Sequence, residues 1–190
     1  MGLKAGIIGL PNVGKSTIFN ALCSGKAAAE NYPFCTIEPN HGVVEVPDER
    51  LSQITSCIET GRVVPALIEL IDIAGLVRGA SRGEGLGNQF LGHIKEVDAI
   101  IHVVRLFEDS SVVHVDGSID PERDIDTIET ELIVKDLDTA EKSLTKLSKN
   151  KSQDREHELL LSSLELIVNN LSSGVPIRKI DLSPEMLHSI

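Results

Sequence analysis

One stretch of the sequence decides the fold: Gly9-Leu10-Pro11-Asn12-Val13-Gly14-Lys15-Ser16-Thr17. It fits the pattern G-x-x-x-x-G-K-[ST], the phosphate-binding P-loop. The flanks supply the context that this motif needs, since residues 3–8 form an apolar run of strand length and Ile18, Ala21 and Leu22 follow at helical spacing. A strand that enters a glycine-rich turn and then a helix aims several backbone N–H groups at one point. The positive end of the helix dipole attracts an anion to the same point.

The residue types in this stretch suit a bound nucleoside triphosphate. Glycine lets the backbone approach a phosphate without a Cβ in the way. Lys15 would lie along the β- and γ-phosphates, and the hydroxyl of Ser16 would ligate Mg²⁺. A chance match in an ordinary strand-to-helix turn is disfavoured by the flanking pattern. The predicted nucleotide-binding residues are Asn12, Val13, Gly14, Lys15, Ser16 and Thr17.

Length and composition restrict the classes of protein that remain. A chain of 190 residues with 41% hydrophobic residues is long enough for one good-sized core, or one core plus an appendage. The net charge of −11 argues against direct binding to nucleic acid or to an anionic membrane. Three cysteines without C-x-x-C spacing favour reduced thiols, and the six histidines show no metal-ligand spacing with them. Neither a signal peptide nor a membrane-spanning run is evident, so a cytoplasmic location is expected.

Strand and helix patterns alternate over the first part of the chain. Strands are predicted over residues 42–46, 63–71 and 99–104, with a helix capped by Asp48 and another over residues 88–97. The last strand is a nearly continuous apolar run, which is typical of a strand buried on both faces. This order predicts an α/β fold, with a mostly parallel sheet and helices on both of its faces.

The pattern changes after Asp109. Two amphipathic helices, opened by Pro121 and separated by a polar turn at residues 150–153, predict an antiparallel helical hairpin. The hairpin is acidic on balance, and a solvated outer face is favoured over an arm that binds a partner. The expected domains are a nucleotide-binding part at 1–109, a helical insertion at 110–175 and an incomplete return towards the first domain at 176–190.

A second motif completes the expected site. Asp72-x-x-Gly75 follows an apolar strand, which is where switch nucleotidases place an Asp for Mg²⁺ and a Gly N–H for the γ-phosphate. Thr36 lies in the long connection before the next strand, where such proteins place a threonine over the metal, although a plain loop remains an alternative. We therefore expect Mg²⁺ to be held by Ser16, Thr36 and Asp72. The predicted catalytic residues are Lys15, Thr36 and Gly75.

These motifs together resemble the YchF or Obg-like ATPase family of P-loop GTPase-type proteins. The stretches that carry the resemblance are Gly9 to Thr17, Asn31-Tyr32-Pro33-Phe34-Cys35-Thr36-Ile37-Glu38-Pro39-Asn40, and Asp72-Ile73-Ala74-Gly75-Leu76-Val77 with the glycine-rich run to Gly87. The resemblance implies a Ras-like domain with a coiled-coil insertion, hydrolysis of ATP in preference to GTP, and association with ribosomes in translation or stress response. The family's base-reading motif would lie beyond residue 190, so the chain is expected to be C-terminally truncated.

The residue after D-x-x-G bears on the rate of hydrolysis. Ras-type enzymes have a glutamine there that orients the attacking water, whereas this chain has Leu76, which forms no side-chain hydrogen bond. Slow intrinsic turnover is therefore expected. Arg78 and Arg82 are candidates for charge stabilisation in cis, although solvated loop arginines are the commoner case. Asn12 belongs to a P-loop type that helps to coordinate potassium in some related GTPases.

Two function classes are compatible with the sequence. The favoured one is a Mg²⁺-dependent P-loop nucleotide hydrolase that acts as a switch, with ATP preferred and GTP as the alternative. The other is a nucleotide-gated binding module with negligible intrinsic hydrolysis, an interpretation that Leu76 supports. A small-molecule kinase is disfavoured because D-x-A-G at a strand end is not typical of that class.

Overall fold

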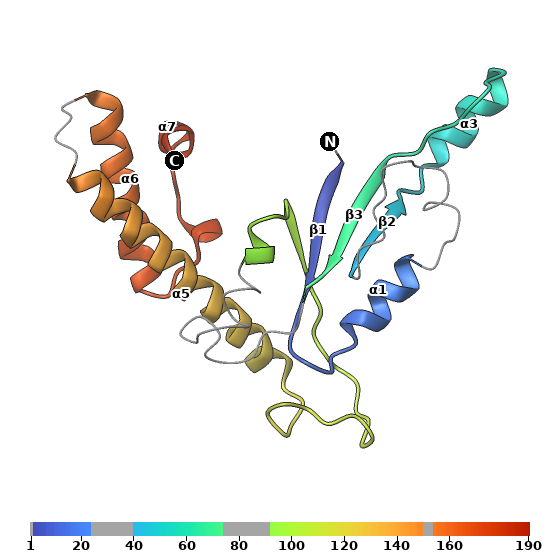
Figure 1. The fold of residues 1–190 in the computed structure, drawn as a ribbon, viewed down its shortest axis with the longest axis horizontal. Coiled ribbons are helices and arrows are strands. Elements are labelled where there is room, and N and C mark those ends of the chain that lie inside the picture. The colour runs from blue at the N-terminus through green and yellow to red at the C-terminus, as the bar shows by residue number, and fades with distance from the viewer. Residues whose placement is uncertain (1, 24–39, 74–91, 150–153) are drawn as a thin grey trace. The chain divides into compact units, whose positions relative to one another are not determined.

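The computed structural model describes residues 2–23, 40–73, 92–149 and 154–190 (Figure 1). The chain divides into two units near Pro121, where the helix α5 (Pro121–Ser148) begins. Each unit has its own secondary structure. Five residues singled out from the sequence lie outside the described residues: Thr36, Gly75, Leu76, Arg78 and Arg82.

The described part of the first unit is built on a four-stranded sheet. Its strands are β1 (Leu3–Ile8), β2 (His41–Glu45), β3 (Leu67–Asp72) and β4 (Ala99–His102), in the order β2-β3-β1-β4. The central strand β1 pairs in parallel with both β3 and β4, whereas β2 is antiparallel to β3. The predicted α/β class with a mostly parallel sheet is thus confirmed, and β2 is the antiparallel member.

Burial is greatest in the middle of the sheet. Ile7 and Ile8 of β1 are 0% and 1% exposed, but Ile100 and Ile101 of β4 are 42% and 40% exposed. The expectation that this last apolar run is buried on both faces is therefore wrong. The reason is topological, because β4 is the last strand on its side of the described sheet.

Local signals account for the helices of this unit. Helix α1 (Lys15–Cys23) starts inside the P-loop, and α3 (Glu49–Cys57) is capped by Asp48, whose side chain accepts a hydrogen bond from the Arg50 N–H at 3.0 Å. The predicted helix over 88–97 is only partly described, and residues 92–94 of it are helical. Strand β3 begins at Leu67, later than residue 63, since Pro65 has no N–H to offer a neighbouring strand.

The second unit is helical. Helix α5 (Pro121–Ser148) is followed by α6 (Arg155–Ser172), a 3₁₀ turn at Ile177–Lys179 and α7 (Pro184–Ser189), and Figure 1 shows α6 returning alongside α5 as predicted. Ala140 of α5 packs in one cluster with Ile167 and Leu171 of α6. Among the described helices, none combines the length and the apolar character that crossing a membrane requires.

Candidate functional site

Three strands bring the predicted site residues that the structure describes to one edge of the sheet. Because β1, β3 and β4 are parallel, their carboxyl ends lie at the same edge, the usual ligand-binding edge of such sheets. The P-loop follows β1, and Asp72 is the last residue of β3, in register with Ile7. The segment that begins at Val103 follows β4 at this same edge, since the Val103 N–H donates to the Ile8 carbonyl at 2.8 Å.

The P-loop backbone adopts conformations that most residues avoid. Gly9, Asn12 and Gly14 have φ values of 155°, 61° and 99°. At Gly9 a Cβ would lie 2.4 Å from the Val103 carbonyl oxygen, so the absence of a side chain is required there by contact as well as by conformation. Asn12 is among the residue types that tolerate the left-handed region. Val13 is buried at 4% exposure, which fixes the loop to the core.

Lys15 is a buried cation at the start of α1. This residue is 8% exposed, and its Nζ donates to the carbonyl of Leu10, within the P-loop, at 3.0 Å. Burial lowers the pKa of Lys15 from its ordinary value, while the negative charge of Asp72 acts in the opposite direction. A second anion beside this ammonium, such as a phosphate, would offset the cost of burying its charge.

Ser16 and Asp72 meet as the sequence predicts for a metal site. The Ser16 hydroxyl donates to Asp72 Oδ2 at 2.7 Å, although the two residues are 56 positions apart. The other carboxylate oxygen, Asp72 Oδ1, is buried and has no hydrogen-bond partner among the described residues. A hydroxyl and a carboxylate with an unsatisfied oxygen are ligands that suit Mg²⁺. The residues present therefore fit this ion, and the third expected ligand, Thr36, lies outside the described residues.

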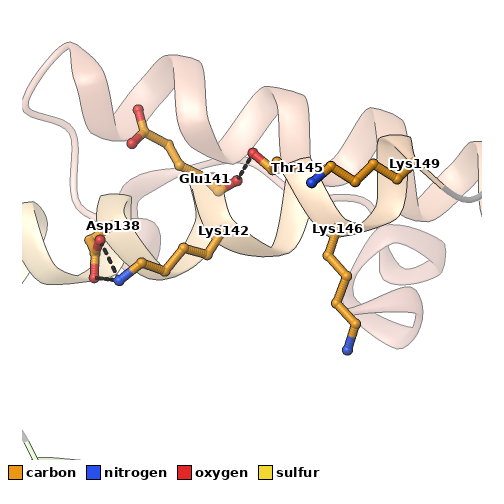
Figure 2. A pocket seen from close by; sticks show the side chains of 6 residues that line it. All are labelled: Asp138, Glu141, Lys142, Thr145, Lys146 and Lys149. Atoms are coloured by element: carbon orange, nitrogen blue, oxygen red, sulfur yellow. Dashed lines mark hydrogen bonds and ion pairs between the residues drawn. The ribbon is translucent and has the colours of Figure 1, made fainter.

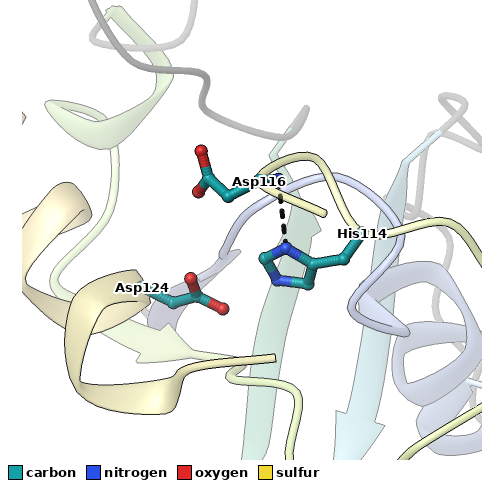
Figure 3. Close-up of side chains that lie close together, drawn as sticks. All are labelled: His114, Asp116 and Asp124. Atoms are coloured by element: carbon teal, nitrogen blue, oxygen red, sulfur yellow. Dashed lines mark hydrogen bonds between the residues drawn. The ribbon is translucent and has the colours of Figure 1, made fainter. Parts of the chain in front are cut away.

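The segment after β4 contributes contacts that the sequence analysis missed. Asn12 Nδ2 donates to the Val113 carbonyl at 3.2 Å, which ties the P-loop to a segment 101 residues further along the chain. Next to it, His114 is 7% exposed, and Figure 3 shows its ring turned toward the backbone of Asp116, whose N–H donates to Nδ1 at 3.2 Å. Only one sequence signal could have located this segment: it follows the third of three parallel strands.

A surface hollow of about 440 Å³ lies elsewhere, along the last turns of α5 (Figure 2). Two hydrogen bonds in its lining are local, since Lys142 Nζ donates to Asp138 Oδ2 at 2.8 Å and Thr145 Oγ1 donates to the Glu141 carbonyl. Both are contacts within one helix turn, and Figure 2 shows the side chains of Lys146 and Lys149 extending in different directions. This arrangement is that of a solvated helix face, so the hollow is not a second candidate site.

Comparison with known proteins gives consistent matches along the chain. Residues 4–154 match the family model for 50S ribosome-binding GTPases. The chain is 54% identical over 191 residues to the ribosome-binding ATPase YchF of Haemophilus ducreyi, an alignment that covers 100% of this chain and 53% of that protein. The corresponding protein of Bacillus subtilis is 50% identical over 186 residues, which cover 97% of this chain and 51% of the relative.

A solved structure agrees with these relatives. The structure of the Schizosaccharomyces pombe YchF GTPase superimposes with a TM-score of 0.82 at 41% identity, covering 99% of this chain and 52% of the other. The chain therefore spans about half the length of the curated relatives that it matches.

Proposed function

Because the chain belongs to the 50S ribosome-binding GTPase family, and within it to the YchF branch, we propose that it is a Mg²⁺-dependent P-loop nucleotide hydrolase. The observation that carries the proposal is the Ser16–Asp72 hydrogen bond of 2.7 Å, together with the unsatisfied Asp72 Oδ1 and the buried Lys15. The unsatisfied oxygen and the buried ammonium cost stability in a protein without a ligand, and a metal–triphosphate complex would offset both costs.

In the proposed mechanism, backbone N–H groups of residues 12–17 and the ammonium of Lys15 bind and orient the phosphates. Ser16, Asp72 and Thr36 hold Mg²⁺, which neutralises negative charge on the phosphates when it is bound. The N–H of Gly75 is proposed to contact the γ-phosphate. Turnover is slow, because Leu76 stands where a glutamine would orient the attacking water.

The preferred nucleotide is proposed to be ATP. The curated relatives are named ribosome-binding ATPases, whereas the Schizosaccharomyces pombe structure and the family model are named for GTP hydrolysis. GTP is therefore the alternative substrate. A switch that binds a partner in one nucleotide state without significant hydrolysis is the second candidate function, favoured by Leu76.

The remaining parts of the proposal concern the location, the partner, a further ion and the bounds of the domains. We propose that the chain acts in the cytoplasm with the ribosome as its partner, because the curated relatives are named ribosome-binding ATPases. Potassium is a further proposed ion, held with the participation of Asn12. The nucleotide-binding, helical and returning parts are proposed to span residues 1–109, 110–175 and 176–190.

Binding and single-turnover hydrolysis, with and without Mg²⁺ and ribosomes, test this function. ATP and GTP are compared on the chain and on Lys15→Ala, with Lys95→Ala as a control because Lys95 lies in an exposed turn. Mg²⁺-dependent binding that Lys15→Ala removes and Lys95→Ala retains is the expected result. Binding without measurable hydrolysis, even with ribosomes, favours the switch module. Absence of Mg²⁺-dependent binding of either nucleotide at millimolar concentration refutes both functions.

A further inference from the structure

The segment after β4 is organised around one buried arginine. Arg105 is 2% exposed, and its guanidinium donates to backbone carbonyl oxygens only, as far as the described residues show. The three acceptors are the carbonyls of Phe107 at 3.1 Å, Asp109 at 3.1 Å and Val112 at 2.9 Å. A single side chain thus closes a loop of several residues on itself.

The chemistry of this contact requires arginine. A guanidinium presents five N–H donors in a rigid planar fork, so it can serve three carbonyls that point inward from one loop, whereas the ammonium of lysine is a compact donor on a flexible stem. The Phe107 ring adds a stacking surface, with its centroid 4.6 Å from the guanidinium carbon. Ser111 stabilises the same loop, since its N–H and its hydroxyl both donate to Asp109 Oδ1, at 2.8 and 2.6 Å.

The loop ends directly on the P-loop. Val112, the last carbonyl that Arg105 holds, is followed by Val113, whose carbonyl accepts the hydrogen bond from Asn12 Nδ2 at 3.2 Å. Asn12 is the residue of the P-loop with a φ of 61°, a conformation that costs a non-glycine residue free energy unless its side chain is held. The direction in which the Val113 carbonyl points therefore bears on the shape of the phosphate-binding turn.

We propose that Arg105 is a positioning residue for the P-loop. By fixing the Val112 carbonyl it orients the adjacent Val113 carbonyl as the acceptor for Asn12, and so holds the loop in the conformation that receives a phosphate. The inference rests on the proposed function, because it assigns Arg105 to the same nucleotide site. Its first consequence can nevertheless be measured without any nucleotide.

The first experiment observes the side-chain amide of Asn12 by ¹⁵N nuclear magnetic resonance. Its signal is assigned by its loss in Asn12→Gly, a change that keeps the left-handed conformation accessible. In the wild-type chain one amide proton is expected to exchange slowly, and in Arg105→Lys it is expected to exchange at least severalfold faster. Arg62→Lys serves as a matched control, since Arg62 is exposed. Unchanged exchange in a folded Arg105→Lys variant overturns the proposal.

The second experiment is a double-mutant cycle on the Kd of a fluorescent ATP analogue with Mg²⁺. Loss of one hydrogen bond predicts a Kd roughly two- to tenfold higher for Arg105→Lys and for Asn12→Gly. If Arg105 acts through Asn12, the double variant is no weaker than the weaker single variant. Effects that multiply overturn the proposal. A wild-type chain that binds no nucleotide refutes the proposed function instead, and the amide exchange result then decides the inference alone.

A milder substitution covers the case in which Arg105→Lys does not fold. Phe107 is 50% exposed, so Phe107→Leu removes the ring beside the guanidinium without opening the core. Faster exchange of the Asn12 amide in this variant supports the proposal. Exchange equal to that of the wild-type chain overturns it.

Discussion

Replacing Gly9 by alanine should destabilise the first unit far more than the same change at two other glycines. At Gly9 the new Cβ would lie 2.4 Å from the Val103 carbonyl oxygen and 3.2 Å from Val13 Cγ2. The oxygen belongs to the backbone and cannot rotate away, so the ends of β1 and β4 must separate. That movement strains the neighbouring hydrogen bond from the Val103 N–H to the Ile8 carbonyl.

The expected cost combines two separate effects. Forcing an extra methyl group into a packed contact costs about 1–3 kcal/mol, and holding an L-residue at a φ of 155° costs about 1–3 kcal/mol more. Gly9→Ala is therefore expected to lower the free energy of unfolding by about 2–6 kcal/mol. Against a total of about 5–15 kcal/mol for a typical domain, this is a large fraction.

Two control glycines separate the effects. Gly14 has a φ of 99°, but a Cβ added there would meet nothing within 4 Å, so Gly14→Ala should show the backbone cost alone, about 1–3 kcal/mol. Gly61 has neither a close contact nor a positive φ, so Gly61→Ala should be neutral or stabilising by up to about 1 kcal/mol. The expected order of stability is Gly61→Ala, then Gly14→Ala, then Gly9→Ala.

Urea unfolding followed by circular dichroism measures these differences in the absence of nucleotide. Because the chain has two units, hydrogen–deuterium exchange of peptides containing β1 assigns the loss to the first unit. A loss of about 2 kcal/mol corresponds to exchange about thirtyfold faster. The reasoning is refuted if Gly9→Ala lies within about 0.5 kcal/mol of Gly61→Ala. Equality with Gly14→Ala would show that the contact with Val103 contributes nothing.

Three further substitutions test the metal site, the buried cation and the second unit. Asp72→Asn should abolish the additional rise in melting temperature that Mg²⁺ and nucleotide produce together, since an amide is a weaker ligand for Mg²⁺ than a carboxylate. Lys15→Met should abolish nucleotide binding. Burial lowers the pKa of Lys15, so the unfolded chain keeps the proton of this side chain to a higher pH than the folded chain does. The free energy of unfolding of the wild type should therefore rise, relative to that of Lys15→Met, as the pH approaches 10.5, which urea unfolding at a series of pH values measures. Ile167→Ala, at a site 3% exposed, should cost about 2–5 kcal/mol by chemical unfolding, whereas Ile54→Ala, at a site 53% exposed, should stay within about 0.5 kcal/mol.

Features that depend on neighbouring residues were predictable from the sequence. The P-loop with its strand and helix is contiguous, and the cap at Asp48 needs only a residue two positions away. Helix α7 likewise begins where Ser183 precedes a proline, and its side chain accepts from the Met186 N–H at 3.2 Å. In each case the interacting groups lie within about one helical turn. The residues that signal the start of the helix in the sequence are therefore the same residues that form the contact in the structure.

Burial was less predictable, because it depends on what covers a residue. The periodicity of α5 correctly indicates an amphipathic helix, yet Asp124 and Glu131 are also buried, at 2% and 8% exposure. The spacing of apolar residues does not indicate which carboxylates are buried with a hydrogen-bond partner. Asp124 is such a case, since its Oδ1 accepts a hydrogen bond from Arg123 at 3.0 Å. Similarly, an apolar run predicts that β4 is a strand but not that it lies at the side of the described sheet.

The contacts that complete the site are the least visible in the sequence. Asn12 and Val113 are separated by 101 positions, and the acceptor is a backbone carbonyl, which any residue type could supply. Arg105 resembles any arginine that follows a strand. Such contacts become predictable only from topology, since parallel strands that share an edge also bring their following loops together.

The distribution of unfavourable features in the first unit argues that its stability is organised around a ligand. Three backbone conformations with positive φ and a buried ammonium lie within seven residues of one loop, and the unsatisfied oxygen of Asp72 is joined to that loop through Ser16. Asn12 at its positive φ, the buried Lys15 ammonium and the unsatisfied Asp72 Oδ1 each cost on the order of 1–3 kcal/mol. Gly9 and Gly14 add no such cost, because glycine adopts positive φ readily. A sheet whose central strand is buried from Ala5 to Ile8 tolerates this total, and the same packing prevents the loop that follows from relaxing into another conformation. Binding of a metal–triphosphate complex is therefore expected to offset the costs at Lys15 and Asp72, while the loop keeps its backbone conformation.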